Sequence, residues 1–180
     1  MTWLETFSLW RRSQSSNVYL FFTADFKRVE QFTDMAESKD INKLMVGQRL
    51  SRPFEFAEML FYDVQRQQLR QIGARANEEA VPWQTVGTQV DGKLKTHPVL
   101  LILSYVLNDG HASLLTDILT AWAQDPALYE QKSTVAVFAS GEHLFPETLR
   151  RITCPIDIET GSEEERKALL ESTVKEVQKG

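Results

Sequence analysis

The sequence predicts one α/β domain with a mostly parallel sheet flanked by helices. Residues 98–107 form the most apolar run, and an unbroken run of this length is typical of a strand buried on both faces. Strand-like and helix-like segments alternate along the chain, which is the order that produces parallel sheets. With 180 residues, 42% of them hydrophobic, the chain is long enough for a sizeable core. We therefore expect a single domain over residues 1–180.

The N-terminal segments predict a helix, a strand and a second helix. Apolar residues at helical spacing (Trp3, Leu4, Phe7, Trp10) indicate a short helix that ends before polar residues 13–16. Residues 17–23 predict a buried strand. A helical pattern follows at positions 26, 29, 32 and 36, whereas residues 39–53 show only a weak pattern, so we expect a loop there.

Two hairpins are expected in the middle of the chain. Residues 58–64 predict a strand, and residues 69–72 follow a short polar break, so we expect the two segments to pair. Residues 73–82 are polar and are expected to be exposed. Within residues 83–96, the dipeptide Asp91-Gly92 lies between short apolar segments, which favours a second, tight hairpin.

The segments after the central strand are easier to assign. Residues 114–122 predict an amphipathic helix that stops at Asp125-Pro126, residues 134–139 a buried strand, and residues up to 151 a short helix. Residues 155–158 predict a strand at or near an edge, because Pro155 cannot donate a ladder hydrogen bond. Ser162 and Glu165 form a capping box that predicts a final amphipathic helix.

Composition limits the classes of partner and the cellular location. A net charge of -5 and scattered basic residues give no broad attraction to phosphate backbones or anionic lipid, so we expect neither nucleic acid nor membrane as a partner. Trp3, Glu5 and Trp10 interrupt the apolar core that a signal peptide needs. The lone Cys154 cannot form an internal disulfide, and we expect it to be a structural thiol. A cytoplasmic protein is expected.

One short motif resembles a phosphate loop in spacing. Gly87, Gly92 and Lys93 have the required separation, but Leu94 stands where magnesium binding needs Ser or Thr. A phosphate loop also needs a helix that starts at the lysine, and residues 94–97 leave no room for one before the central strand. We favour the hairpin. A variant nucleotide site that uses Gly87, Gly92, Lys93 and Asp109 stays open as the alternative.

Candidate metal or acid–base residues are not clustered in the sequence. None of His97, His111 and His143 has the spacing of a metal ligand pair, and each lies beside a predicted turn or strand end. Asp109 and His111 follow the central strand, where ligands of α/β sheets gather, but a turn explains them equally. We expect no metal site and no cofactor.

The second half of the chain, from His97 to Thr173, resembles the AAA+ ATPase module in the order and spacing of its segments. The matching segments are the apolar strand and its helix, then residues 133–141, 144–151, 156–158 and 162–166. The resemblance implies a three-layer P-loop/RecA-like domain. It also implies that the acidic pair that ends the family's central strand falls on Ser104 and Tyr105, and the sensor asparagine near Gly141. These residues cannot hold magnesium or polarise a water molecule as expected of the family.

The first half, with its strand at 17–23 and its strand and polar turn at 59–69, resembles the inert first module that some bacterial and plastid AAA proteins carry ahead of an active one. The resemblance implies a noncatalytic AAA-like domain that acts through protein contacts, with an ATPase module of the same polypeptide continuing beyond Gly180. The AAA+ resemblance also places Arg150 or Arg151 where an arginine of the family reaches the nucleotide of a neighbouring subunit. We favour the simpler role of cations at a helix end. A small nucleotide-binding P-loop-type NTPase and a free-standing adaptor remain open alternatives.

Overall fold

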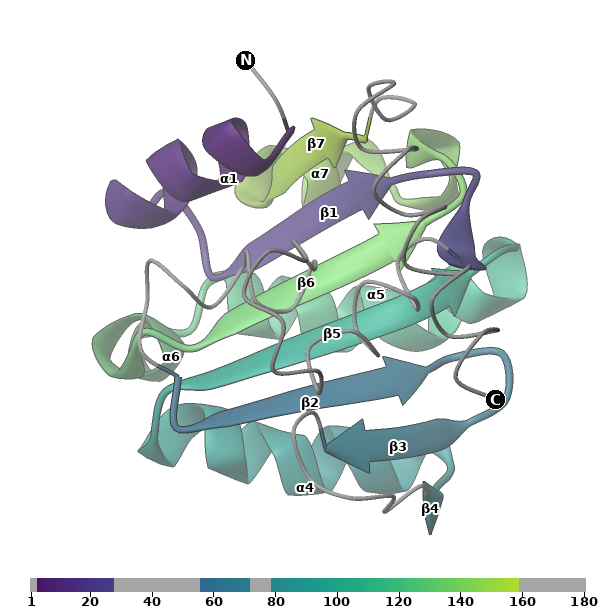
Figure 1. Ribbon diagram of the computed structural model, residues 1–180, viewed down its shortest axis with the longest axis horizontal. Helices are drawn as coiled ribbons and strands as arrows, with labels where there is room; N and C mark the ends of the chain where they lie inside the picture. The colour runs from purple at the N-terminus through teal and green to yellow at the C-terminus, as the bar shows by residue number, and fades with distance from the viewer. Residues whose placement is uncertain (1–2, 28–55, 72–78, 159–180) are drawn as a thin grey trace, which may run out of the picture.

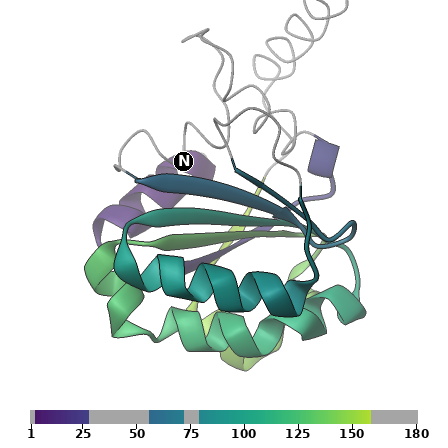
Figure 2. The ribbon, with the colours of Figure 1, turned by 90° about the horizontal axis from the view of Figure 1, so that it is seen from below.

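A computed structural model describes residues 3–27, 56–71 and 79–158, and within these ranges seven strands form one sheet with helices on both faces (Figures 1 and 2). The strands are β1 (Val18–Phe22), β2 (Glu58–Asp63), β3 (Gln68–Gln71), β4 (Glu79–Ala80), β5 (Val99–Val106), β6 (Thr134–Ala139) and β7 (Cys154–Asp157). The helices are α1 (Trp3–Arg12), α4 (Trp83–Thr96), α5 (Asp109–Ala123), α6 (Pro126–Gln131), α7 (Glu147–Ile152) and the 3₁₀ helix η2 (Glu142–Leu144). The expected α/β class with a mostly parallel sheet is confirmed. No helix in the described ranges combines the length and the apolar composition that crossing a membrane requires.

The sheet is parallel except at one side. Its order is β4-β3-β2-β5-β6-β1-β7, and β2, β5, β6, β1 and β7 run in the same direction. Strands β3 and β4 extend it in antiparallel fashion beyond β2, so the predicted pairing of residues 58–64 with 69–72 is confirmed. Strand β5 lies between β2 and β6, and seven of its eight residues are buried. The prediction of a central strand in residues 98–107 is therefore also confirmed.

Alternate residues of the parallel strands enter two separate cores. In β1, Val18 and Leu20 belong to the core beneath α4, α5 and α7, whereas Tyr19 and Phe21 belong to the core that includes Phe7 of α1. Figure 2 shows α4 and α5 on one side of the sheet and α1 on the other. Because both faces of β1 and β5 are covered, these strands need apolar residues at every position rather than at every second one.

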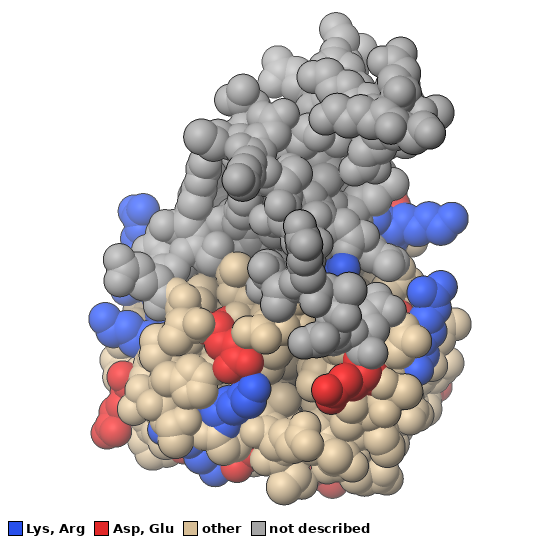
Figure 3. All heavy atoms as spheres, turned by 60° about the horizontal axis from the view of Figure 1, so that its bottom comes forward, with Lys and Arg blue, Asp and Glu red and all other residues tan. Residues whose placement is uncertain are grey.

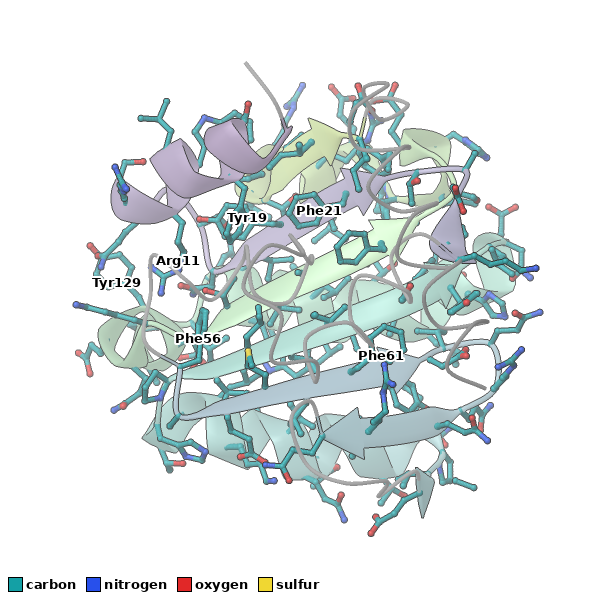
Figure 4. All side chains as sticks on the ribbon, in the orientation of Figure 1. Arg11, Tyr19, Phe21, Phe56, Phe61 and Tyr129 are labelled. Atoms are coloured by element: carbon teal, nitrogen blue, oxygen red, sulfur yellow. The ribbon has the colours of Figure 1, made fainter. Side chains whose placement is uncertain are left out.

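Phe7 and Arg11 attach helix α1 to the sheet. Phe7 is fully buried against Tyr19 and Phe21, with ring centroids 4.8 and 5.8 Å away. The buried Arg11 donates from Nε to Oγ1 of Thr134 over 2.7 Å and from Nη2 to a carbonyl oxygen in the turn before β6. Figure 4 shows Arg11 and Tyr19 on the same face of the sheet as Phe21 and Phe61. The predicted first helix is confirmed, and its Phe7 lies in the core.

The second predicted hairpin is wrong, because residues 83–96 form one continuous helix, α4. Trp83, Val86, Val90 and Leu94 are its buried large apolar residues, and their spacing of three and four residues is the helical pattern that the Asp91-Gly92 signal concealed. Asp91 forms an ion pair with Lys95 one turn later over 3.0 Å and accepts a hydrogen bond from Nε1 of Trp122. Asp91 therefore stabilises the helix instead of starting a turn.

Two smaller expectations also need correction. Residues 79–80, in a segment expected to be only exposed polar chain, form the short strand β4, which pairs with β3. Helix α6 was not expected after the stop at Asp125-Pro126. It begins there because Asp125 accepts a hydrogen bond from the backbone N–H of Ala127 and Pro126 occupies the first turn, where a missing N–H costs nothing.

Strand β7 confirms the predicted edge position. It pairs only with β1 among the described strands, and Pro155 lies within it. The N–H of Ile158 donates to the carbonyl oxygen of Phe22, so the alternate residues Pro155 and Asp157 direct their backbone groups away from the sheet. Pro155 therefore removes a donor only from the outer edge. The predicted helix after residue 26 and the predicted final helix lie outside the described residues.

Substitution of Gly92 distinguishes a helix from a turn. In α4 a Cβ at Gly92 would meet no atom within 4 Å. Gly92→Ala should therefore raise the free energy of unfolding by about 0.5–1 kcal/mol, since alanine has the better helix propensity. Urea unfolding of the purified chain measures this change.

Gly87→Ala is the matched control, because the new Cβ would lie only 3.2 Å from Cδ1 of Ile118 on α5. Crowding at this contact should cancel part or all of the gain in helix propensity. A loss of stability in Gly92→Ala would contradict the helix and would indicate a turn with positive φ at this residue.

Candidate functional site

The carboxyl ends of the parallel strands form the edge where α/β sheets most often bind ligands. Strands β1 and β6 are neighbours, but the next strand in the chain lies in opposite directions along the sheet for the two. After β6 the chain continues to β7, beyond β1, whereas after β1 it continues to β2, beyond β6 and β5. The strand order therefore reverses between β1 and β6. Such a switch opens a crevice at the strand ends in many α/β proteins. The residues that follow β1, β5 and β6 are therefore the candidates for a ligand site.

Polar groups at this edge are used in local hydrogen bonds. The N–H of Thr23 donates to the carbonyl oxygen of Ala139 over 2.9 Å, and the Oγ1 of Thr23 accepts from the N–H of Asp25 over 3.1 Å. Ser140 donates its N–H to the carbonyl oxygen of Val106 and its hydroxyl to that of Leu107. These bonds join the ends of β1, β5 and β6 to one another.

The end of the central strand is occupied by Ser104 and Tyr105. The register between β5 and β6 shifts after Leu103, and Tyr105 adopts a φ of 65°. A shift of this kind redirects a side chain. Here the ring of Tyr105 stacks on Phe26, which follows β1, with the ring centroids 5.3 Å apart and the ring planes at 22°. An aromatic pair thus connects the ends of β1 and β5, on either side of β6.

Ser104 has no formal charge and is closed off from solvent. Its exposed fraction is 0%, and no hydrogen-bond partner for its Oγ lies within the described residues. It lies beside Asp63, whose Oδ1 caps the following turn by accepting from the N–H of Arg66 over 2.9 Å. The nearest carboxylate on β2 is therefore engaged in a turn.

Gly141 follows β6, where the AAA+ resemblance expects an asparagine. A Cβ at this position would lie 2.6 Å from the ring of His143. The ring of His143 occupies the space that a side chain at residue 141 would need, so an asparagine here would require the ring to move.

The four residues of the alternative nucleotide site do not come together. Gly87 lies in the middle of α4 against α5, and Gly92 and Lys93 lie one turn or more further along the same helix. Asp109 is the first residue of α5, at the carboxyl end of β5. Lys93 lies near the opposite end of the eight-residue strand β5, roughly 25 Å away at about 3.3 Å per residue. No phosphate loop is present at these residues.

Lys93 belongs instead to a small ionic cluster at the amino edge of the sheet. Its Nζ lies 2.8 Å from Oε1 of Glu58, and Nε2 of His97 lies 3.1 Å from Oε2 of the same carboxylate. Partial burial acts to raise the pKa of Glu58, but the hydrogen bonds and charges of Lys93 and His97 outweigh it and hold that pKa below its ordinary value. The sequence did not reveal this cluster, because Glu58 is 35 and 39 residues away from its partners.

The two candidate arginines lie in the last turn of α7. Arg151 is exposed and forms an ion pair with Glu147 one turn earlier, over 2.8 Å. Arg150 is half-buried, and its guanidinium approaches Glu142 of η2 to 4.0 Å. Both positions suit the negative end of the helix dipole.

The remaining candidates have structural roles. His111 accepts a hydrogen bond at Nδ1 from the N–H of Leu107, while its own N–H is capped by Asn108. Cys154 is buried, and burial raises the pKa of its thiol to about 11, as expected for a structural thiol. In the part of the chain that the structure describes, no group of three or more His, Cys, Asp or Glu residues is placed to hold a metal ion.

The described residues thus form an α/β domain with a seven-stranded, mostly parallel sheet flanked by helices. No protein-family model matches the chain, and no curated protein matches its sequence. Among solved structures it is similar to the crystal structure of Saccharomyces cerevisiae RIF2, with a TM-score of 0.42 and 10% sequence identity. The match covers 94% of this chain and spans 64% of the length of the RIF2 chain.

The Glu58 cluster predicts a pH-dependent contribution to stability. Since the folded-state pKa of Glu58 is lowered, the contribution is present above the ordinary pKa of 4.5 and is lost as the pH falls through the lowered value. Glu58→Gln should therefore cost about 0.5–1 kcal/mol at pH 7, the size of a partly exposed ion pair. The cost should disappear in acid.

Urea unfolding of the parent chain and of Glu58→Gln, from pH 7 down to below the lowered pKa of Glu58, measures the difference in the free energy of unfolding. Glu130→Gln, at an exposed glutamate of α6, is the control and should change the free energy of unfolding by less than about 0.5 kcal/mol. An equal cost of Glu58→Gln at both ends of the pH range would show that its charge does not matter.

Proposed function

We propose that this chain is a noncatalytic AAA-like domain that acts through protein contacts within or beside a larger AAA+ ATPase. The observation that carries the proposal is the composition of the carboxyl edge. Where the family resemblance places two acidic residues, the chain has the enclosed hydroxyl of Ser104 and the ring of Tyr105 stacked on Phe26. Neither residue can bind a magnesium ion as a carboxylate does.

The strand order supports the family part of the proposal. If the parallel strands β1, β2, β5, β6 and β7 are numbered one to five in chain order, they lie in the order 5-1-4-3-2. The dinucleotide-binding order places the first strand between the second and the fourth, and the flavodoxin-like order places it between the second and the third. A first strand between the fourth and the fifth resembles the sheet of AAA+ modules. This order favours the proposal over an unrelated adaptor.

The distribution of charges favours a noncatalytic role over a variant nucleotide site. Phosphate binding needs backbone N–H groups and a cation close together, with a carboxylate nearby for magnesium. The Lys93 side chain is paired with Glu58 at the amino edge, whereas Asp109 lies at the carboxyl edge. Folding therefore separates the residues that such a site would have to combine.

The first functional test is nucleotide binding. Calorimetric titration of the full chain with ATP or ADP and magnesium should give no saturable heat at micromolar concentrations, because the carboxyl edge presents no acidic pair. Lys93→Ala should give the same flat titration as the parent chain. Saturable micromolar binding would overturn the noncatalytic proposal, and its loss in Lys93→Ala would establish the variant nucleotide site instead.

The second functional test separates the two roles of the α7 arginines. In the polypeptide or complex that contains the proposed ATPase module, Arg151→Ala should leave ATPase turnover unchanged, because its ion pair lies within its own helix. Arg150→Ala should likewise preserve turnover and lower stability by about 0.5 kcal/mol through the dipole and the Glu142 contact.

ATPase assays and thermal unfolding of the same preparations check both expectations. A fall in turnover without a change in stability would instead assign the mutated arginine to a neighbouring subunit's nucleotide.

A further inference from the structure

A groove of about 550 Å³ runs between α4 and α5 on the outer surface of the helical layer. It is lined by Trp83, Gly87 and Asp91 of α4 and by Ser113, Leu114 and Ile118 of α5, together with two polar residues of α4. Figures 1 and 2 show these helices side by side against one face of the sheet. The groove forms where the missing side chain of Gly87 lets α4 approach Ile118 closely.

The groove presents apolar surface to solvent. Leu114 is 43% exposed and Ile118 is half-buried. Trp83 forms part of the wall, and the centroid of its ring lies 6.3 Å from that of Trp122. Removal of apolar surface from water is favourable, so covering Leu114 would favour association. Successive large residues on α5 are four positions apart, which aligns Leu114 and Ile118 along one side of the helix.

The charges around the groove are mainly negative. Helix α5 contains Asp109 and Asp117 and no Lys or Arg, and Asp117 lies four residues after Ser113, on the groove side of the helix. The basic residues of α4 are confined to its last turn. There Lys95 lies 3.0 Å from Asp91 and 3.4 Å from Asp125, and Lys93 is paired with Glu58. Among the described residues Asp109 and Asp117 form no ion pair, so they can attract positive charge.

We propose that the α4–α5 groove binds an amphipathic helix of a partner protein that has large apolar residues on one face and Lys or Arg beside them. Two adjacent helices offer the ridges between which a third helix packs. The lining from Trp83 to Asp91 covers eight residue steps of α4, about 12 Å, which matches roughly two turns of a bound helix. The inference rests on the proposed role in protein contacts and gives that role a surface and a partner chemistry.

Figure 3 shows that acidic and basic side chains on the face it displays are scattered over a largely uncharged surface. The described residues on that face therefore form no extended patch of one sign to which a partner could bind by charge alone. Specificity has to come from apolar side chains in a groove, with the aspartates orienting the bound helix.

The test uses a fluorescein-labelled synthetic peptide of about 15 residues, roughly four helical turns, with leucines at i, i+4 and i+7 and lysines beside them. Fluorescence anisotropy with the full chain should show saturable binding. A peptide of the same composition with its leucines distributed around the helix, and one with glutamates in place of lysines, should each bind at least about tenfold more weakly, a difference of 1.4 kcal/mol.

Two variants locate the binding to the groove. Leu114→Gln should weaken binding about tenfold, and Asp117→Asn about threefold with a smaller dependence on salt. Tyr129→Gln, at an exposed apolar residue of α6, and Asp157→Asn, at an exposed carboxylate of β7, are the matched controls and should change affinity less than about twofold. All four positions are exposed, and circular dichroism melts check that the variants fold.

Equal binding of the patterned and redistributed peptides, or unchanged affinity in Leu114→Gln, would overturn the inference. Light scattering provides a third check. A parent chain that is dimeric at the assay concentration, and that Leu114→Gln converts to a monomer, would show that a second copy occupies the groove instead. The nucleotide titration is independent of these outcomes, so loss of the groove proposal leaves the noncatalytic proposal standing or falling on its own result.

Discussion

The burial of β5 on both faces is the constraint on which the rest of the domain depends. Its neighbours β2 and β6 satisfy its backbone groups, and its alternate side chains enter two different cores. An eight-residue strand without a polar face has to be covered on both sides, because exposure of either apolar face would cost several kcal/mol. Helices α4 and α5 cover one face, and α1 brings Phe7 to the core on the other.

The parts of the fold that could be predicted from the sequence are those in which apolar pattern and length agree. Strands β1, β5 and β6 are short runs of apolar residues, and α5 repeats its buried residues at three- and four-residue spacing. Helix α4 was missed because the dipeptide Asp91-Gly92 is a strong local turn signal. The helical pattern is visible only over about three turns, from Trp83 to Leu94. The longer-range pattern prevailed, since tertiary packing rewards the whole apolar face of a helix.

The site was predictable in its composition but not in its geometry. The resemblance to the AAA+ module placed the family's acidic pair on Ser104 and Tyr105, and the sequence shows that neither residue is acidic. The sequence does not show the positive φ of Tyr105. It also does not show that the Tyr105 ring stacks on Phe26, which lies 79 residues earlier in the chain. The cluster of Glu58, Lys93 and His97 was hidden for the same reason. Contacts between side chains that are distant in sequence depend on strand order and register, and local pattern does not determine these.

The position of Pro155 also affects how this domain can grow into larger assemblies. A free strand at the side of a sheet is a template on which another chain can add a strand, and unlimited addition leads to fibrils. At β7 the outward-facing backbone carries a proline, and at the other side β4 is only two residues long. Both margins of the sheet are thus poor templates within the described residues. Edge-to-edge pairing of sheets from different copies is therefore disfavoured, which protects the apolar strands from pairing with those of other copies. Helix and loop surfaces are left for recognition.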